Sequence, residues 1–148
     1  MSKFKQIQLQ TLDKHLAKVS VTEVPSNGWI KAIRSCLGMS IQQLATRMGI
    51  TKQSLSRLER NEVDDSITLK SLRKAAESLN CRLVYALVPN EDGLQGIVEK
   101  QATLKAKELA SSVDHTMQLE SQGVDNLQEK ITEIAEELAK NPNSKLWA

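Results

Sequence analysis

Five polar or basic residues stand together on what reads as the outward face of one short helix. They are Lys52, Gln53, Ser54, Ser56 and Arg57. Their amide, hydroxyl and cationic groups match the donors and acceptors of base edges and phosphates. Gln53 is suited to pair bidentately with adenine, while Lys52 and Arg57 suit either guanine or phosphate. The chemistry that this pattern predicts is the reading of a DNA sequence.

The elements that would hold this helix are predicted over residues 40–59. Ser40, with Gln43 three residues later, forms a capping-box pattern that starts a first helix. Gly49 suits the left-handed conformation that ends it, and Thr51 is a good cap for the second helix. Two short helices joined by such a turn indicate a helix-turn-helix. The alternative is an ordinary helical hairpin with a solvated polar face.

The stretch resembles the phage-repressor (Cro/C1, or XRE) family of helix-turn-helix domains. The resemblance is carried by Gln42, Gln43, Leu44, Ala45, Gly49, Leu58 and Glu59. One departure is Ile41, which stands where the family often has a glutamine that touches DNA. The resemblance implies that Thr68 and Lys70, at the start of a later helix, lie near phosphate. We also count Gln42 and the outward Arg34 as candidate DNA contacts.

Charge is divided unevenly along the 148 residues. Residues 1–88 hold 14 Lys and Arg against 7 Asp and Glu, whereas residues 89–148 hold 6 against 11. A basic part and an acidic part suggest nucleic acid as one partner and a protein as another. The alternative is a chance segregation of solvated faces.

Motifs of catalysis and of metal binding are absent from the sequence. There is no phosphate-binding loop, metal-ligand spacing or nucleophile motif, and His15 and His115 are isolated. Cys36 and Cys81 lie in apolar contexts that suggest reduced thiols. We therefore expect no enzyme activity, catalytic residue, metal, cofactor or small-molecule substrate. Without a long apolar run or a signal pattern, we expect a cytoplasmic protein with no membrane partner.

Residues 81–88 are apolar and β-branched, and Pro89 follows them. This pattern predicts a buried strand, for which the chain offers no convincing partner. Pairing with the same strand of a second subunit would solve this, as in the HipB-type antitoxins that the segment resembles. The dimerising residues would be Leu83, Val84, Tyr85, Ala86 and Leu87. The alternative is an extension of the preceding helix.

We therefore expect a mainly α fold: a five-helix phage-repressor-like domain with one dimerising strand and additional terminal helices. Residues 1–26 would form a helix and connector, 27–89 the DNA-binding domain, and 90–148 a helical partner-binding region. The helix over residues 3–19 has an apolar side, to which we assign Phe4, Ile7, Leu12, Leu16 and Val19. It could cover the core, pair with a second subunit or follow a phosphate backbone.

Most of residues 27–122 resembles the family called mobile mystery protein A. The resemblance is carried by Gly28–Arg34, Ser66–Arg73, Cys81–Pro89 and His115–Glu120. Members accompany a Fic-domain protein, so the resemblance implies an antitoxin and repressor whose partner is a Fic-domain toxin. Many Fic domains are held inactive by a helix with the pattern Ser/Thr-x-x-x-Glu-Gly/Asn.

Thr116 and Glu120 match this inhibitory pattern, with Ser121 in place of the usual Gly or Asn. They are one helical turn apart, so both would face the same way. In that mechanism the glutamate pairs with an arginine that would otherwise hold the γ-phosphate of ATP. Plain helix surface is the alternative. A stand-alone phage-type regulator, or an adaptor without DNA binding, remain the competing functions.

Overall fold

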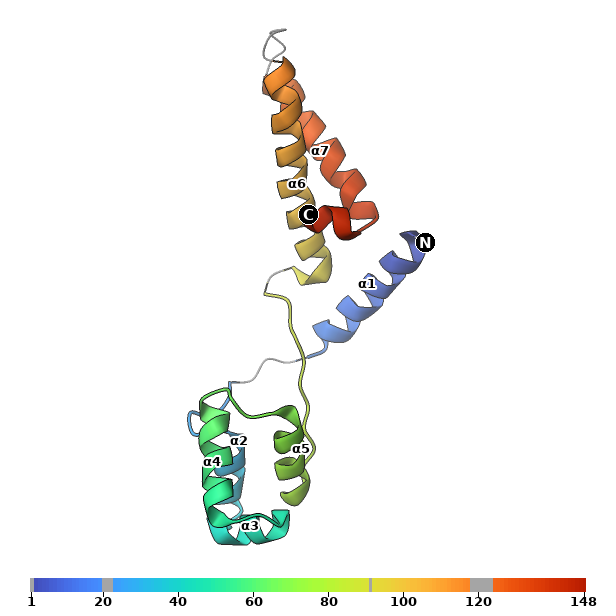
Figure 1. The fold of residues 1–148 in the computed structure, drawn as a ribbon. Coiled ribbons are helices and arrows are strands. Elements are labelled where there is room, and N and C mark those ends of the chain that lie inside the picture. Colours follow the sequence, from blue (N-terminus) through green and yellow to red (C-terminus); the bar gives the residue numbers. More distant parts are fainter. Residues whose placement is uncertain (1, 20–22, 91, 118–123) are drawn as a thin grey trace. The chain divides into compact units, whose positions relative to one another are not determined.

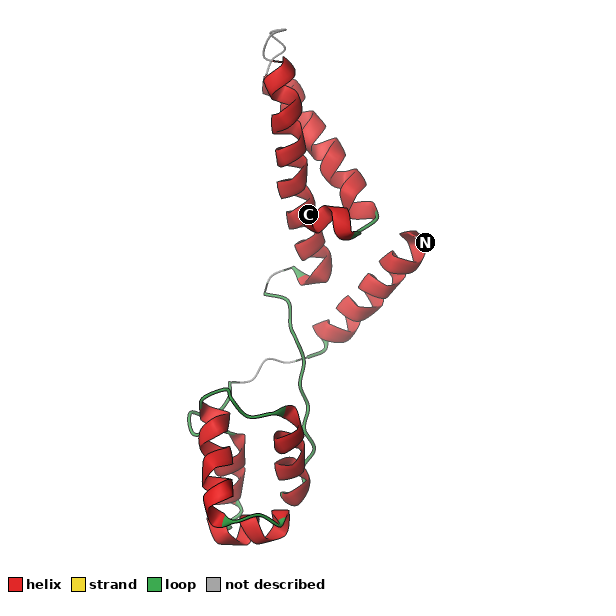
Figure 2. Ribbon diagram, viewed as in Figure 1, coloured by secondary structure: helices red, strands yellow, loops and turns green. Residues whose placement is uncertain are grey.

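The computed structural model describes residues 2–19, 23–90, 92–117 and 124–148, and its regular structure there is helical (Figure 2). Two compact units are present: a central unit, Val21–Tyr85, and a terminal unit, Met1–Ser20 with Ala86–Ala148. Figure 1 labels the helices α1 (Ser2–Ala17), α2 (Trp29–Cys36), α3 (Ile41–Met48), α4 (Lys52–Val63), α5 (Leu69–Ser78), α6 (Gly93–Met117) and α7 (Val124–Lys140); a 3-10 helix, η2 (Ser144–Trp147), follows them.

Helices α2 to α5 of the central unit enclose one apolar core. Its buried members come from all four helices and from the residue that ends α5: Ile30, Leu44, Ala45, Leu55, Ala75 and Leu79. The two alanines leave room for close approach between helices, and the larger aliphatic side chains fill the centre. This core fixes α4 against α3 without help from aromatic residues, which make up only 3% of the sequence.

Three helices of the central unit begin at the caps that the sequence predicts. Ser40 accepts a hydrogen bond from the backbone N–H of Gln43, whose side chain accepts one from the N–H of Ser40. Thr51 and Thr68 cap α4 and α5 by accepting hydrogen bonds from the backbone N–H groups of Ser54 and Ser71. Gly49 adopts a left-handed conformation with φ 70° and ends α3. These caps set the tight turn between α3 and α4.

Helix α2 begins without a side-chain cap from its own N-terminal segment. Gly28 is the cap residue and supplies no side-chain acceptor. Instead, the carboxylate of Glu62 on α4 accepts hydrogen bonds from the N–H groups of Trp29 and Ile30, at 2.6 and 2.9 Å. Gly28 has φ 83°, and a Cβ there would lie 2.9 Å from that carboxylate. Only glycine therefore fits this contact without strain.

The predicted strand over residues 81–88 is not observed. These residues form a loop without regular secondary structure, and the described part of the central unit holds four helices rather than five (Figure 2). A strand needs a second strand to satisfy its backbone groups, and the described part of this single chain supplies none. The segment leaves Val84 and Leu87 largely exposed, with 76% and 83% of their surface accessible.

In the terminal unit, α6 and α7 lie side by side and pack through small residues (Figure 1). Ala102, Ala106 and Ala110 of α6 are buried, and Ile131 is buried on α7. Leu146 of η2 closes one end of this interface and is almost fully enclosed against Val98 and Ala102. Alanines at helical spacing allow the two helices to approach closely along much of their length.

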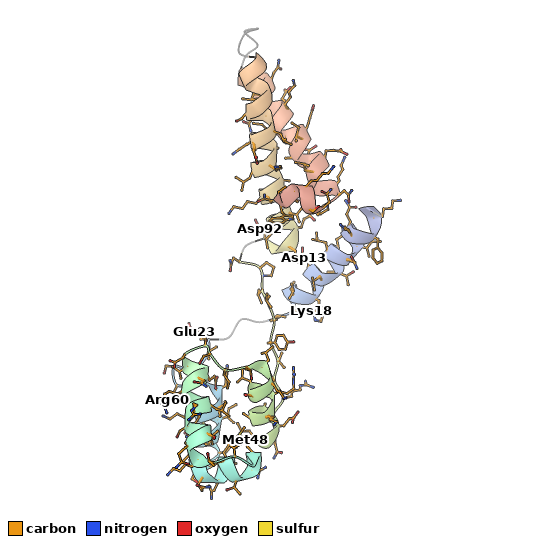
Figure 3. All side chains as sticks on the ribbon, in the orientation of Figure 1. Asp13, Lys18, Glu23, Met48, Arg60 and Asp92 are labelled. Atoms are coloured by element: carbon orange, nitrogen blue, oxygen red, sulfur yellow. The ribbon has the colours of Figure 1, made fainter. Side chains whose placement is uncertain are left out.

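Polar side chains, rather than a broad apolar face, attach α1 to this pair of helices. The carboxylate of Asp13 accepts hydrogen bonds from the N–H groups of Leu94 and Gln95 at the start of α6, at 2.6 and 3.0 Å. Figure 3 labels Asp13 on α1. Gln6 donates to the carbonyl of Lys140 at the end of α7, at 2.6 Å. These contacts satisfy backbone groups that each helix leaves unpaired at its ends.

Of the three roles left open for α1, covering the core does not fall to its larger apolar residues in this chain. Phe4 and Ile7 are 66% and 59% exposed, and Leu9 is the α1 residue that packs against the apolar cluster of α6, α7 and η2. The structure turns the opposite face inward because Asp13 and Gln6 there supply caps for two helix ends.

Candidate nucleic-acid interface

Helix α4 presents the predicted reading face to solvent. Lys52, Gln53 and Arg57 are exposed, and Ser56 is half-buried. On the opposite side Leu55 is completely buried in the core of the central unit. Because one face of α4 is fixed by this packing, the exposed amide and the two cationic groups project from a rigid support. Such a support limits the entropy lost when the side chains bind a duplex.

Ser54 contributes to the start of α4 more than to its exposed face. Its N–H donates to the Thr51 hydroxyl at 3.1 Å, and the two hydroxyl groups lie 2.9 Å apart. The half-buried Ser54 thus helps to hold the turn that positions Lys52 and Gln53. Its predicted role as a direct DNA contact stays a prediction.

The other predicted contacts lie at the starts of α3 and α5. Gln42 is exposed in the first turn of α3, and its amide is 3.3 Å from the Thr46 hydroxyl. Thr68 caps α5 by accepting from the N–H of Ser71, and Lys70 is exposed in the first turn. A helix start carries partial positive charge and free N–H groups, which favours a nearby phosphate. Lys70 adds a full positive charge at this end of α5.

Arg34 lies inside the central unit instead of on its outer face. Its Nε and Nη2 donate to the carboxylate of Glu59 at 2.7 and 3.2 Å, and its Nη1 donates to the carbonyl of Met39 at 3.1 Å. The side chains of the ion pair are only 12% and 8% exposed. Arg34 therefore joins α2 to α4, and we leave it out of the proposed DNA contacts.

Sequence reasoning missed the role of Glu59 and Glu62 as internal partners. The signal was present, because Glu59 and Glu62 follow Leu55 by four and seven residues and so share its inward side. One carboxylate is neutralised by Arg34 and the other binds a helix start. Residues 21–85 hold 10 Lys and Arg against 6 Asp and Glu. With two carboxylates used internally, the outward charge of this unit is predominantly positive.

The remaining predicted sites lie in the terminal unit or in the segment that leads to it. Of the dimerising residues, Leu83 is half-buried, whereas Val84, Tyr85, Ala86 and Leu87 are exposed. Thr116 lies in the last turn of α6, for which only the backbone is described. Glu120 lies outside the described residues, so the geometry of the predicted inhibitory pair is not defined.

No cluster of three or more potential metal-ligating side chains occurs among the described residues. Within the same residues, no helix is long and apolar enough to cross a membrane.

Helices α3 and α4 are short and are joined by a tight turn. One side of α4 is buried in the core, and its exposed side is polar and basic. This arrangement defines a helix-turn-helix DNA-binding protein. A family model described as Helix-turn-helix matches residues 30–85, which cover α2 to α5 and the start of the following loop. The chain therefore carries an XRE-type helix-turn-helix domain, the DNA-binding part of a transcription regulator. No curated protein and no solved structure matches the chain.

Proposed function

We propose that this chain is a homodimeric, non-enzymatic transcription repressor that reads a palindromic operator with the α4 helix of each subunit. The observation that carries the proposal is the exposed Lys52, Gln53 and Arg57 face on a helix whose other side is buried. Gln42 and Lys70, at the starts of the neighbouring helices, would position the domain on phosphates. Dimerisation would place two reading helices about one turn of DNA apart.

The exposed apolar run from Val84 to Leu87 supports the dimer. Monomeric proteins seldom leave such residues together in water, and an unpaired β-branched segment is suited to pair with its symmetry mate. The backbone N–H and C=O groups of the segment would then be satisfied across the two-fold axis. The strand that the single chain lacks would form on assembly.

Replacing Gln53 by alanine should weaken binding to the operator by about 1–3 kcal/mol and relax the base preference at one position in each half-site. The reason is the loss of a bidentate amide–base contact. Titration of DNA fragments from the gene's own promoter region, with each base varied in turn, measures both effects. The exposed Gln10 on α1 gives a matched control, since Gln10→Ala removes an amide outside the domain. Equal affinity of the wild type for unrelated DNA would refute the proposed function.

We propose in addition that the terminal unit binds a Fic-domain toxin and that the chain is its antitoxin. The resemblance of residues 27–122 to the mobile mystery protein A family supports this partner. A helical unit separate from the DNA-binding domain leaves one chain able to hold two different partners. Inhibition would come from Glu120, which would take an arginine of the toxin away from the γ-phosphate of ATP.

Glu120→Gly should release AMP transfer by the toxin without separating the two proteins. Binding would be spread over α6, whereas inhibition would depend on one carboxylate. An AMP-transfer assay on the co-purified pair measures release, and operator titration should show unchanged DNA binding. A Glu120→Gly complex that still transfers no AMP would favour steric blocking of the toxin's active site. Failure to co-purify with a Fic-domain neighbour would leave a stand-alone regulator.

A further inference from the structure

Two lysines at the C-terminal end of α1 carry charge that the rest of the terminal unit does not neutralise. Lys14 lies in the last turn of α1 and Lys18 in the turn that follows it, and both are exposed. They are four residues apart, so they share one side of the helix. Among the residues that the structure describes, neither side chain forms an ion pair or a hydrogen bond.

The one acidic residue of α1 is turned away from these lysines. The carboxylate of Asp13 accepts hydrogen bonds from the N–H groups of Leu94 and Gln95, so its charge is held at the start of α6. Lys5 also lies toward the other helices, since it donates to the carbonyl of Pro142 at 3.2 Å. The inward side of α1 thus meets the ends of other helices, and its outward side keeps a positive charge that can act on a partner.

Lys18 is tied to the DNA-binding domain by a short connector. Gly28, at which α2 begins, follows Lys18 by ten residues. A chain of that length spans at most roughly 36 Å when fully extended, which is about one turn of a DNA duplex. Figure 3 labels Lys18 where the connector leaves α1. The two lysines therefore cannot lie far from a duplex that the domain holds.

The connector enters the domain at the end that also holds the start of α5. Glu62, in the last turn of α4, binds the N–H groups of Trp29 and Ile30. The carbonyl of Asn61 accepts hydrogen bonds from the two residues that precede Thr68, at 2.9 and 3.2 Å. The starts of α2 and α5 thus share one end of α4. Because Lys70 in the first turn of α5 is assigned to phosphate, lysines on this connector can reach the phosphates beyond it.

We propose that Lys14 and Lys18 bind the phosphate backbone of the duplex that flanks the bases read by α4. The contact rests on the proposed function, because it takes a duplex held by α4 as its starting point. Tethering gives the two lysines a roughly millimolar effective concentration beside that duplex, so individually weak contacts add to the affinity. Phosphate contacts carry no sequence information, so the gain is the same for every flanking sequence.

Lys14→Gln with Lys18→Gln should weaken binding to a long duplex and leave binding to a short one unchanged. The short probe is a promoter-region duplex cut at the outermost bases whose substitution changes affinity. The long probe extends it by about ten base pairs on each side. On the long probe alone, the double variant should reduce the magnitude of the slope of log affinity against log salt by roughly 2 per chain.

Two controls separate position from net charge. Lys14→Arg with Lys18→Arg keeps both charges and should bind as the wild type does. Lys107→Gln with Lys145→Gln removes two exposed lysines of the same unit, from α6 and η2, and should leave the difference between the two probes unchanged. Equal salt slopes for the wild type and the Lys14→Gln, Lys18→Gln variant on both probes would overturn the contact. An unchanged slope with a loss of dimer mass would instead assign this face of α1 to a second subunit.

Directed cleavage locates the contact on the duplex. Thr11 is exposed three residues before Lys14 on the same side of α1, so a cysteine there can carry an iron chelate while both lysines remain. In a background with Cys36 and Cys81 replaced by serine, the chelate should cleave the long probe within about one turn of the outermost base read by α4. Intact flanks would overturn the proposal. Wild-type affinity that ignores sequence would refute the proposed function, whereas sequence-specific binding with intact flanks would refute the flanking contact alone.

Discussion

Glu59→Ala should destabilise the central unit by about 3–5 kcal/mol. The substitution removes the acceptor of two hydrogen bonds from Arg34 and leaves a buried guanidinium with only the carbonyl of Met39. An unpaired charge in that position is much costlier than the pair is stabilising. Since small domains are stable by about 5–15 kcal/mol, the loss would approach the total for this unit.

Urea unfolding followed by the fluorescence of Trp29 measures this loss, in a Trp147→Phe background that leaves one tryptophan. Glu77→Ala, which removes an exposed glutamate of α5, is the matched control and should change stability by less than about 0.5 kcal/mol. Arg34→Met with Glu59→Leu should recover most of the stability, since it leaves no unpaired charge. An equal, small effect of Glu59→Ala and Glu77→Ala would contradict the structural role of the ion pair.

Val84→Pro should convert the proposed dimer to monomers and lower the affinity for the proposed operator by about 10²–10⁴-fold. Proline removes a backbone donor and blocks strand pairing, while each separated subunit can read only one half-site. Light scattering after size-exclusion chromatography gives the mass, and operator titration gives the affinity. Val84→Ile keeps the N–H group and the β-branched shape, so it should behave as wild type. An unchanged mass for Val84→Pro would place the dimer contact elsewhere.

The reading helix was predictable because its determinants are local. Caps such as Ser40 and Thr51 act within one turn, and the inward position of Leu55 follows from helical spacing. Arg34 was misplaced because its partner, Glu59, comes from another helix. Spacing can place Glu59 on an inward face, but it does not say which helix supplies the opposite charge.

The facing of α1 and the missing strand both depend on contacts between distant parts of the sequence. Leu9, rather than Phe4 and Ile7, faces inward on α1, because Asp13 accepts from N–H groups at the start of α6 and Gln6 donates to a carbonyl at the end of α7. The 81–88 pattern has strand character, yet a strand depends on a partner that periodicity cannot supply. In both segments local pattern indicates amphipathic or extended structure, and contacts remote in sequence decide the outcome.

The cap that Asp13 provides to α6 bears on the order in which the chain folds. This contact joins residues 81 apart, and the contact of Gln6 with Lys140 joins residues 134 apart, whereas Arg34 and Glu59 are only 25 apart. Closing a longer loop costs more chain entropy, and non-local contacts form more slowly. On the ribosome, α1 emerges before α6 and must await it, while the residues between them can already fold. Folding of the DNA-binding domain shortens the loop that must close before the terminal unit can form. Each chain therefore completes its helix-turn-helix domain before it completes its terminal unit.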